Sequence, residues 1–249
     1  MNRTAPAGGY VGGTKRHYRR NIWAAFRRDC PVPVHRAQAL LMPTAEGDEV
    51  RVALNNGFRE ENLHLVDKNA AIAAHLKRRF PKSTCYGVLV SRAAKRIARA
   101  GIELDVANLD LCGKVTGPTY SELRQFVASG VVRDRGLVAV TLLRGRELAF
   151  NEIITDGFFH AGASCSDEAD RGRMARLRFC IIGTSTPCDG GTLGFDAEVV
   201  RYDRYRSTAG TQTMLWAALR LSKKFFSFAE CAALDEEYRK NLLEFNGAL

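Results

Sequence analysis

The chain has 249 residues, of which 46% are hydrophobic and 26% charged, and its 37 Lys and Arg against 27 Asp and Glu give a formal net charge of +10. This composition excludes a disordered, collagen-like or coiled-coil protein and predicts a folded protein with a sizeable core. The sequence shows neither an apolar run near the roughly 18 residues of a membrane span nor a signal peptide, so we expect a cytoplasmic protein without a membrane partner.

Much of the positive charge lies near the N-terminus. Residues 1–36 hold eight Lys and Arg and one acid, a net charge of +7, which leaves about +3 for the other 213 residues. Charge concentrated in this way is typical of a segment that faces a polyanion. We expect residues 1–33 to form a basic arm with an amphipathic helix, and residues 34–249 to form an α/β domain.

The first expected element is a helix over residues 14–28. Tyr18, Ile22 and Phe26 follow one another at intervals of four and give it an apolar face, opposite a strongly basic one. The basic face predicts contacts with nucleic acid, and a merely solvated face is the alternative. The candidate contacts are Lys15, Arg16, Arg19, Arg20, Arg27 and Arg28.

Strands and helices then alternate as far as residue 143. The expected strands are 37–42, 62–67, 84–88, 102–111 and 136–143, and the expected helices are 48–56, 70–80, 91–100 and 119–129. Apolar strands that alternate with helices of this length indicate a mostly parallel sheet with helices on both faces. The predicted fold class is therefore α/β, with a doubly wound sheet.

The pattern changes after Gly145. We expect a helix over 167–182, a loop over 184–194, an antiparallel hairpin formed by 198–205 and 211–221, and a closing amphipathic helix over 228–245. In the hairpin, Arg204 shares a strand face with Tyr202 and Arg206. Interleaved aromatic and basic side chains can bind nucleic acid, and a charged, solvated edge strand is the alternative.

Ligands of open α/β sheets bind beyond the carboxyl ends of the strands. Asp67 ends the second strand, about 20 residues after the first, where a carboxylate can accept hydrogen bonds from ribose hydroxyls. The alternative for Asp67 is the N-cap of the next helix. In the turn after the first strand, Glu46 and Asp48 can equally be ordinary acids of a first helical turn.

Two polar side chains, Asn108 and Asp110, interrupt the end of the fourth strand. Their burial is costly unless they face a cavity or find partners. Asp110 can orient a nucleophile or abstract a proton, or it can cap the loop amides of Gly113 and Lys114. Cys112, in the same loop, is a weaker candidate nucleophile. The seven cysteines form no C-x-x-C pair, so we expect reduced thiols and no metal.

The order of strands and helices, Asp67, the segment Asn108-Leu109-Asp110 and the terminal hairpin together resemble the class I, Rossmann-like S-adenosylmethionine-dependent methyltransferase family, over roughly residues 35–221. The resemblance implies that S-adenosyl-L-methionine binds at a first turn that is poor in glycine, and at the end of the second strand. The residues so implied are Pro43, Thr44, Ala45, Glu46, Gly47, Asp67 and Lys68.

The same resemblance implies that Asn108 and Asp110 lie beside the transferred methyl group. Together with the basic N-terminal segment it predicts a methyltransferase that acts on nucleic acid, either RNA or DNA. The alternative is a catalytically inactive methyltransferase-like domain that serves as a nucleic-acid-binding or assembly module.

Overall fold

The structure is a computed structural model that describes residues 13–113, 117–144, 177–178, 181, 186–188, 191–206, 213–233 and 236. The helices are α1 (Gly13–Asp29), α2 (Asp48–Asn55), α3 (Ala70–Arg79), α4 (Val90–Arg99) and α5 (Gly117–Ala128), with a 3-10 turn at Glu60–Asn62. The strands are β1 (Ala39–Leu41), β2 (Leu63–Val66), β3 (Thr84–Tyr86), β4 (Leu104–Gly113), β5 (Val132–Arg144), β6 (Thr186–Cys188), β7 (Gly191–Arg206) and β8 (Thr213–Ser227).

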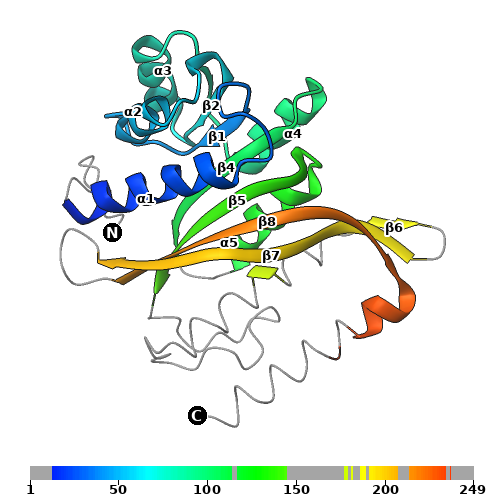
Figure 1. Ribbon diagram of the computed structural model, residues 1–249. Coiled ribbons are helices and arrows are strands. Elements are labelled where there is room, and N and C mark those ends of the chain that lie inside the picture. Colours follow the sequence, from blue (N-terminus) through cyan, green and yellow to red (C-terminus); the bar gives the residue numbers. More distant parts are fainter. Residues whose placement is uncertain are drawn as a thin grey trace, which may run out of the picture.

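The eight strands form one sheet in the order β3-β2-β1-β4-β5-β8-β7-β6 (Figure 1). The first five are parallel, and β8 then runs antiparallel between β5 and β7. The strand order reverses between β1 and β4, where Leu41 pairs with Asn108. The predicted doubly wound sheet with a C-terminal antiparallel hairpin is confirmed, and the reversal point is where such sheets bind ligands.

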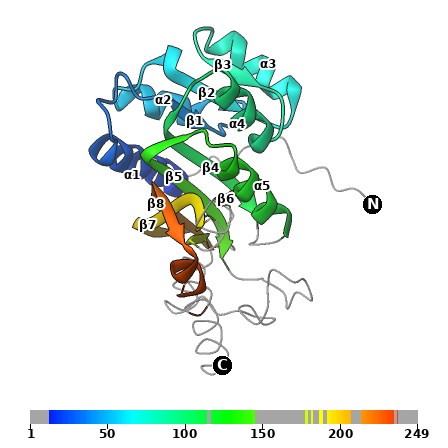
Figure 2. The same cartoon turned by 90° about the vertical axis from the view of Figure 1, so that its right-hand side faces the viewer.

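Helices cover both faces of the sheet, and Figure 2 shows α1 and α5 on opposite sides of it. On one face, α1, α2 and α3 bury residues such as Trp23, Val50 and Leu76 against strand residues that include Leu41 and Leu65. The other face packs against α4 and α5 in the same way. Strand side chains alternate between these two cores, so the strands are mostly apolar on both faces, as buried parallel strands are.

Local sequence signals place the helix ends well. Gly57, Gly101 and Gly130 follow helices with φ angles of 95°, 72° and 70°, as expected for glycines that end a helix. Asn69 caps the start of α3, because its side chain accepts a hydrogen bond from the amide of Ala71 at 2.9 Å.

The predicted loop over 184–194 is wrong, because residues 186–188 form β6 and β7 begins at Gly191. Glycine, threonine and proline in this segment favour a loop locally. However, β7 pairs with the end of β8 from Gly191 opposite Ser227 onward, and β6 pairs with β7. Strand partners distant in the sequence satisfy this backbone, and tertiary pairing overrides the local preference.

The two expected C-terminal helices lie mostly outside the described residues. Within the first, residues 177–178 and 181 are helical, and the second is helical over residues 228–233 and at residue 236. Among the residues that the structure describes, we find no helix that is both long and apolar enough to span a membrane.

Candidate cofactor site

The turn between β1 and α2 is tight and is shaped by its single glycine. The amide of Gly47 donates to the carbonyl of Thr44 at 2.9 Å, and Gly47 adopts a left-handed conformation with φ of 63°. A Cβ atom on Gly47 would lie 2.7 Å from Cζ of Phe80, at the end of α3. The glycine therefore serves the packing of α3 against the turn, a requirement that the sequence alone did not indicate.

Neighbouring polar and charged groups stabilise the ionised carboxylates of this turn. The Thr44 hydroxyl, the amide of Glu46 itself and, more weakly, the positive charges of Arg19 and Arg79 lower the pKa of Glu46. Asp48 forms ion pairs with Arg19 at 3.3 Å and with Arg51 at 2.6 Å. Pro43 is buried, whereas Thr44, Ala45 and Glu46 are half-buried.

Asp67 lies at the carboxyl end of β2, where its amide donates to the carbonyl of Tyr86 on β3 at 3.1 Å. Its Oδ1 accepts a hydrogen bond from the amide of Asn69 at 2.7 Å and so stiffens the turn into α3. Asn69, and not Asp67, is the N-cap of α3. Asp67 is half-buried and Lys68 is exposed, so both are accessible at this edge.

Asn108 is buried, at 2% exposure, near the end of β4. Its side-chain amide donates a hydrogen bond to Oε1 of Glu49 in the first turn of α2, and its Oδ1 is buried without a hydrogen-bond partner. An unpaired buried oxygen is rare in native structures, and a bound ligand, ion or water is among the partners that account for one. The Glu49 contact orients the amide, so that Oδ1 is the atom left for a ligand.

Glu49 was not among the residues predicted from the sequence. It is buried, at 3% exposure, on the same side of α2 as Ala53, four residues later. An acid at a position that the helical period assigns to the core is the signal that could have identified it.

Asp110 follows Asn108 by two residues, so both belong to the same face of β4, which α1, α2 and α3 cover. Asp110 is half-buried. The side chains of Cys112 and Gly113, and the whole of Lys114, lie outside the described parts of the chain, so neither the nucleophile nor the capping alternative is tested. The structure thus brings the turn 43–47, Asp67 and Asn108 to one edge of the sheet.

The cations of α1 do not form one free surface. Arg19 is buried, at 7% exposure, and its guanidinium pairs with Asp48, so its charge is already engaged within the protein. Arg28 pairs with Asp29 at 2.6 Å. Arg20 and Arg27 are exposed, and the side chains of Lys15 and Arg16 lie outside the described part.

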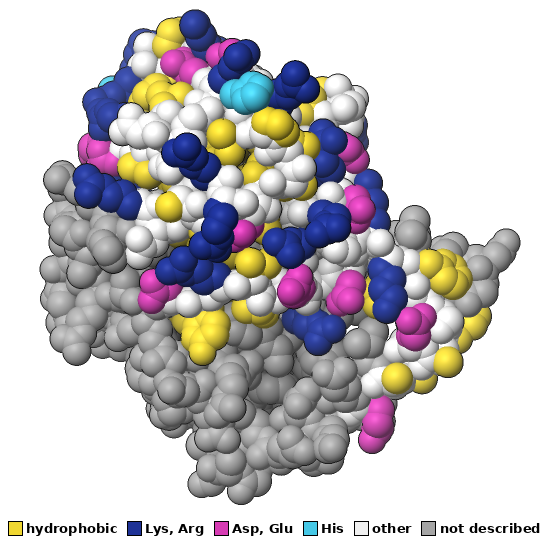
Figure 3. Space-filling view, viewed as in Figure 1, with side chains coloured by type: hydrophobic (Ala, Val, Ile, Leu, Met, Phe, Trp, Pro, Cys, Tyr) yellow, Lys and Arg dark blue, Asp and Glu magenta, His cyan; other side chains and the backbone are white. Residues whose placement is uncertain are grey.

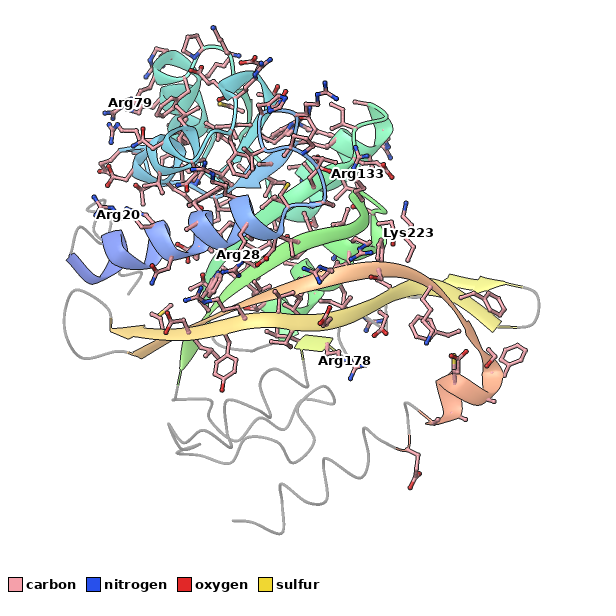
Figure 4. The ribbon with its side chains drawn as sticks, in the orientation of Figure 1. Arg20, Arg28, Arg79, Arg133, Arg178 and Lys223 are labelled. Carbon is pink, nitrogen blue, oxygen red and sulfur yellow. The ribbon has the colours of Figure 1, made fainter. Side chains whose placement is uncertain are left out.

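The cations of α1 are also divided between two edges of the sheet. Arg19 lies beside Asp48, at the carboxyl edge of the parallel strands. Asp29, at the other end of the helix, lies close enough to Arg220 for their charges to interact. Arg220 is on β8 and lies opposite Leu137, near the start of β5, so this end of α1 lies toward the opposite edge of the sheet. Figure 4 shows Arg20 and Arg28 at opposite parts of α1. Only the first half of this helix is therefore near the candidate cofactor site.

Figure 3 shows the face of the molecule that α1 covers, where Lys and Arg side chains are interspersed with Asp and Glu. At the hairpin, the side chain of Arg204 lies outside the described set, and Tyr202 on the same strand is 45% exposed. A groove of about 560 Å³ beside β7 and β8 contains Arg178, paired with Asp196 at 3.4 Å, and Arg220, paired with Glu198 at 3.4 Å. Its cations are already neutralised.

Within the described ranges, no three His, Cys, Asp or Glu side chains come together as metal ligands. Cys30, Cys85 and Cys231 are free thiols and are half-buried. Burial raises the pKa of the Cys30 and Cys85 thiols, so both are protonated at neutral pH.

Comparison with solved structures finds similar folds at low sequence identity. A Streptococcus thermophilus protein assigned as a hemolysin aligns with a TM-score of 0.52 and 14% identity, over 94% of this chain and 78% of its own. A Streptococcus mutans protein assigned as a SAM-dependent methyltransferase aligns with a TM-score of 0.51 and 10% identity, over 84% of this chain and 49% of its own. Trm5b from Pyrococcus abyssi aligns with a TM-score of 0.50 and 12% identity, over 86% and 51%.

The chain thus spans about half the length of the last two proteins. No protein-family model matches it, and no curated protein does. At these identities the alignments establish the fold, which agrees with the strand order: the chain has the fold of class I S-adenosylmethionine-dependent methyltransferases.

Proposed function

We propose that this chain is a methyltransferase that uses S-adenosyl-L-methionine and acts on nucleic acid. The observation that carries the proposal is the meeting of Asp67, the turn 43–47 and the unpaired Oδ1 of Asn108 at the point where the strand order of a methyltransferase fold reverses. Such a site fits a ligand that carries both ribose hydroxyls and an ammonium group, because carboxylate and amide oxygens accept hydrogen bonds from both.

The residues have separate tasks in this proposal. Asp67, steadied by its hydrogen bond from Asn69, accepts from the ribose hydroxyls, and the turn 43–47 with Lys68 forms the wall beside it. Asn108, oriented by Glu49, presents Oδ1 to the ammonium group of the methionine part. S-adenosyl-L-methionine supplies a methyl group on a sulfonium centre.

Asp110, on the same strand face as Asn108, orients the acceptor and takes its proton if one is released. Since the methyl donor is already activated, rate acceleration comes mainly from alignment of the acceptor with the donor. Support for a nucleic-acid substrate comes from the net charge of +10, and this support is weaker than that for the cofactor.

The cofactor proposal is tested by calorimetric titration of the protein, freed of carried-over ligand, with S-adenosyl-L-methionine and with S-adenosyl-L-homocysteine. We expect binding, and we expect Asp67→Asn to weaken it by roughly 10- to 100-fold, as for a lost hydrogen bond to a charged group. Asparagine can still accept from the Asn69 amide, so the turn is retained. Glu61→Ala, an exposed acid just before β2, is the matched control.

Absence of heat at high micromolar ligand would refute the enzyme and favour the alternative, a nucleic-acid-binding module with a methyltransferase fold. One observation favours that alternative: the single glycine of the first turn is already required by Phe80. Equal affinity of Asp67→Asn and wild type would show that the ribose site is assigned wrongly.

A further inference from the structure

A second concentration of positive charge lies outside the N-terminal segment. Residues 68–102 contain nine Lys and Arg and no Asp or Glu, and all nine of these side chains are exposed. The near-neutral balance of the chain after residue 36 conceals this run, because acids elsewhere offset it. The nine cations are Lys68, Lys77, Arg78, Arg79, Lys82, Arg92, Lys95, Arg96 and Arg99.

Four of these cations form a stripe along α4. Arg92, Lys95, Arg96 and Arg99 follow one another at i, i+3, i+4 and i+7, which places them on one side of the helix. The opposite side of α4, which includes Ile97, is buried against the sheet and α5. We call these four residues the α4 stripe.

The stripe is electrostatically unfavourable in the isolated protein. Like charges at i, i+3 and i, i+4 repel one another, and Arg92 lies in the first turn, beside the positive end of the helix dipole. The first turn of α4 contains no acid of its own, and the acid beside it, Glu122 of α5, accepts from the amide and the hydroxyl of Ser91 at 3.2 Å and forms no ion pair with Arg92. In the described part of the structure, none of the four cations has an ion pair with an acid.

Several cations elsewhere in the described part of the molecule are neutralised by acids. Arg19, Arg28 and Arg133 each pair with an Asp, and Lys224 pairs with Glu230 at 3.0 Å. The α4 stripe differs from these paired positions, because it gathers four exposed cations on one side of a single helix and no acid among the described residues pairs with them. Repulsion that is not relieved within the chain is relieved by a polyanion.

We propose that the α4 stripe binds the phosphate backbone of duplex nucleic acid. Its four cations lie within eight residues, Arg92 to Arg99, or about 10 Å of helix. Successive phosphates of one duplex strand advance by about 3.4 Å along the duplex axis, so the stripe matches about three phosphates. The exposed side of α4 carries no aromatic residue on which an unpaired base could stack, which favours a duplex over a single strand.

The position of α4 connects the stripe with the candidate cofactor site. The helix begins just after β3, whose last residue, Tyr86, accepts a hydrogen bond from the amide of Asp67. Arg92 therefore lies at the carboxyl edge of the sheet, and Arg99 lies toward the opposite edge. A duplex backbone bound along the stripe would therefore extend to the edge of the sheet that holds the candidate cofactor site. The stripe contacts phosphates and not bases, so this binding is independent of nucleotide sequence.

The test is fluorescence anisotropy with labelled 20-base-pair DNA and RNA duplexes, measured between 50 and 300 mM KCl. The variant Arg92→Gln/Lys95→Gln/Arg96→Gln/Arg99→Gln keeps good helix formers and removes four charges. The matched control, Arg59→Gln/Arg135→Gln/Lys223→Gln/Lys224→Gln, removes four exposed charges outside the stripe. Urea unfolding of all three proteins confirms that they are folded.

We expect the stripe variant to bind duplex more than tenfold more weakly at 100 mM KCl. Its slope of log affinity against log salt should be shallower by roughly 2 to 3, because about 0.9 is lost for each phosphate contact. The control should change the slope by less than about 1. An unchanged slope for the stripe variant, or an equal change for the control, overturns the proposal.

Vesicles that contain 30% phosphatidylserine provide a further arm. If the stripe drives binding to vesicles and duplex does not compete, the partner is a lipid surface and the proposal is overturned. The nucleic-acid partner proposed for the stripe rests on the proposed function, but different results would refute the two proposals. Duplex binding through the stripe without any binding of S-adenosyl-L-methionine refutes only the enzyme, whereas cofactor binding with an unchanged salt slope refutes only the stripe.

Discussion

At the scale of single residues, the first turn shows how one glycine can be required for a reason that the sequence does not reveal. Gly47 combines a φ of 63° with the ring of Phe80 packed where a Cβ would lie. Gly101 has a similar φ of 72°, but it has no atom within 4 Å of its Cβ position. The two glycines therefore separate the cost of the backbone conformation from the cost of the steric overlap.

We predict that Gly47→Ala lowers the free energy of unfolding by at least about 2 kcal/mol, because backbone strain and overpacking add. Gly101→Ala should cost about 1 kcal/mol, from the backbone alone. Urea unfolding measures both. In a Phe80→Ala background the cost of Gly47→Ala should approach that of Gly101→Ala; an unchanged cost there would disprove the role of the ring.

His64 on β2 is a buried histidine with a structural role. Burial lowers its pKa to about 4, so the folded protein holds it neutral. Its Nδ1 lies 3.3 Å from the Tyr86 hydroxyl and its Nε2 lies 3.0 Å from Oε1 of Gln38, which fits a ring that accepts at Nδ1 and donates at Nε2. Protonation would disrupt this arrangement.

The folded state binds this proton only below about pH 4, whereas an unfolded histidine binds it below about pH 6.5. Stability should therefore fall as the pH is lowered from 6.5 to 4, by up to about 3 kcal/mol from His64 alone. Urea unfolding across this range should show a flatter pH profile for His64→Gln, while His75→Gln, on an exposed position of α3, keeps the wild-type slope. Identical slopes for all three proteins would contradict this assignment.

At the scale of elements, α1 is a structural helix of the sheet domain. Ile22, Trp23 and Phe26 are fully buried, and the Trp23 ring makes edge contacts with Phe26 and Phe58 at centroid distances of 5.2 and 5.0 Å. The amphipathic pattern correctly predicted the helix and its apolar side. Its basic side is partly used inside the protein, through the Arg19 to Asp48 pair.

Trp23→Ala should lower the free energy of unfolding by about 3–5 kcal/mol, as for other large buried side chains. The exposed neighbour Ala24 provides the control, since Ala24→Ser should change it by less than about 0.5 kcal/mol. Denaturant midpoints compare the two variants. If Trp23→Ala is as stable as wild type, α1 is not part of the core.

At the scale of the whole molecule, the two edges of the sheet have different roles. At the carboxyl edge lie the first turn, Asp67 and Asn108. At the opposite edge, the buried Asp105 joins the starts of three strands: it accepts from the amide of Gln38 at 2.8 Å and pairs with Nε of Arg133 at 2.7 Å. Burial raises the pKa of Asp105, and these two contacts only partly oppose that rise.

Asp105→Asn should therefore destabilise the protein by about 2 kcal/mol, since it leaves Arg133 with only the more distant carboxylate of Glu103 at 3.9 Å, yet it should leave cofactor affinity unchanged. Asp67→Asn should show the reverse pattern, with weaker binding and an unchanged denaturant midpoint. Parallel calorimetry and urea unfolding of the two variants test this separation. Loss of cofactor binding in Asp105→Asn, at a temperature where it is fully folded, would contradict it.

Most of the fold could be predicted from the sequence because its signals are local. Helix periodicity, apolar strands and terminal glycines such as Gly101 act within a few residues, and they placed β1 to β5 and α1 to α5. Asp67 and Asn108 could be proposed as site residues because strand ends in such sheets meet at one edge. Strand β6 was missed, since its pairing depends on β7 rather than on its own composition.

The sequence by itself determined the elements, the alternation that makes the sheet parallel, and the net charge of +10. Only the tertiary structure decided which of those charges are free: it pairs Arg19 with Asp48 and leaves the α4 stripe exposed on one side of its helix. It also decided that Gly47 accommodates Phe80 and that Glu49 orients Asn108. The physical reason is that secondary structure follows from neighbours in the chain, whereas the partner of a charge or a ring is set by residues that only folding brings together.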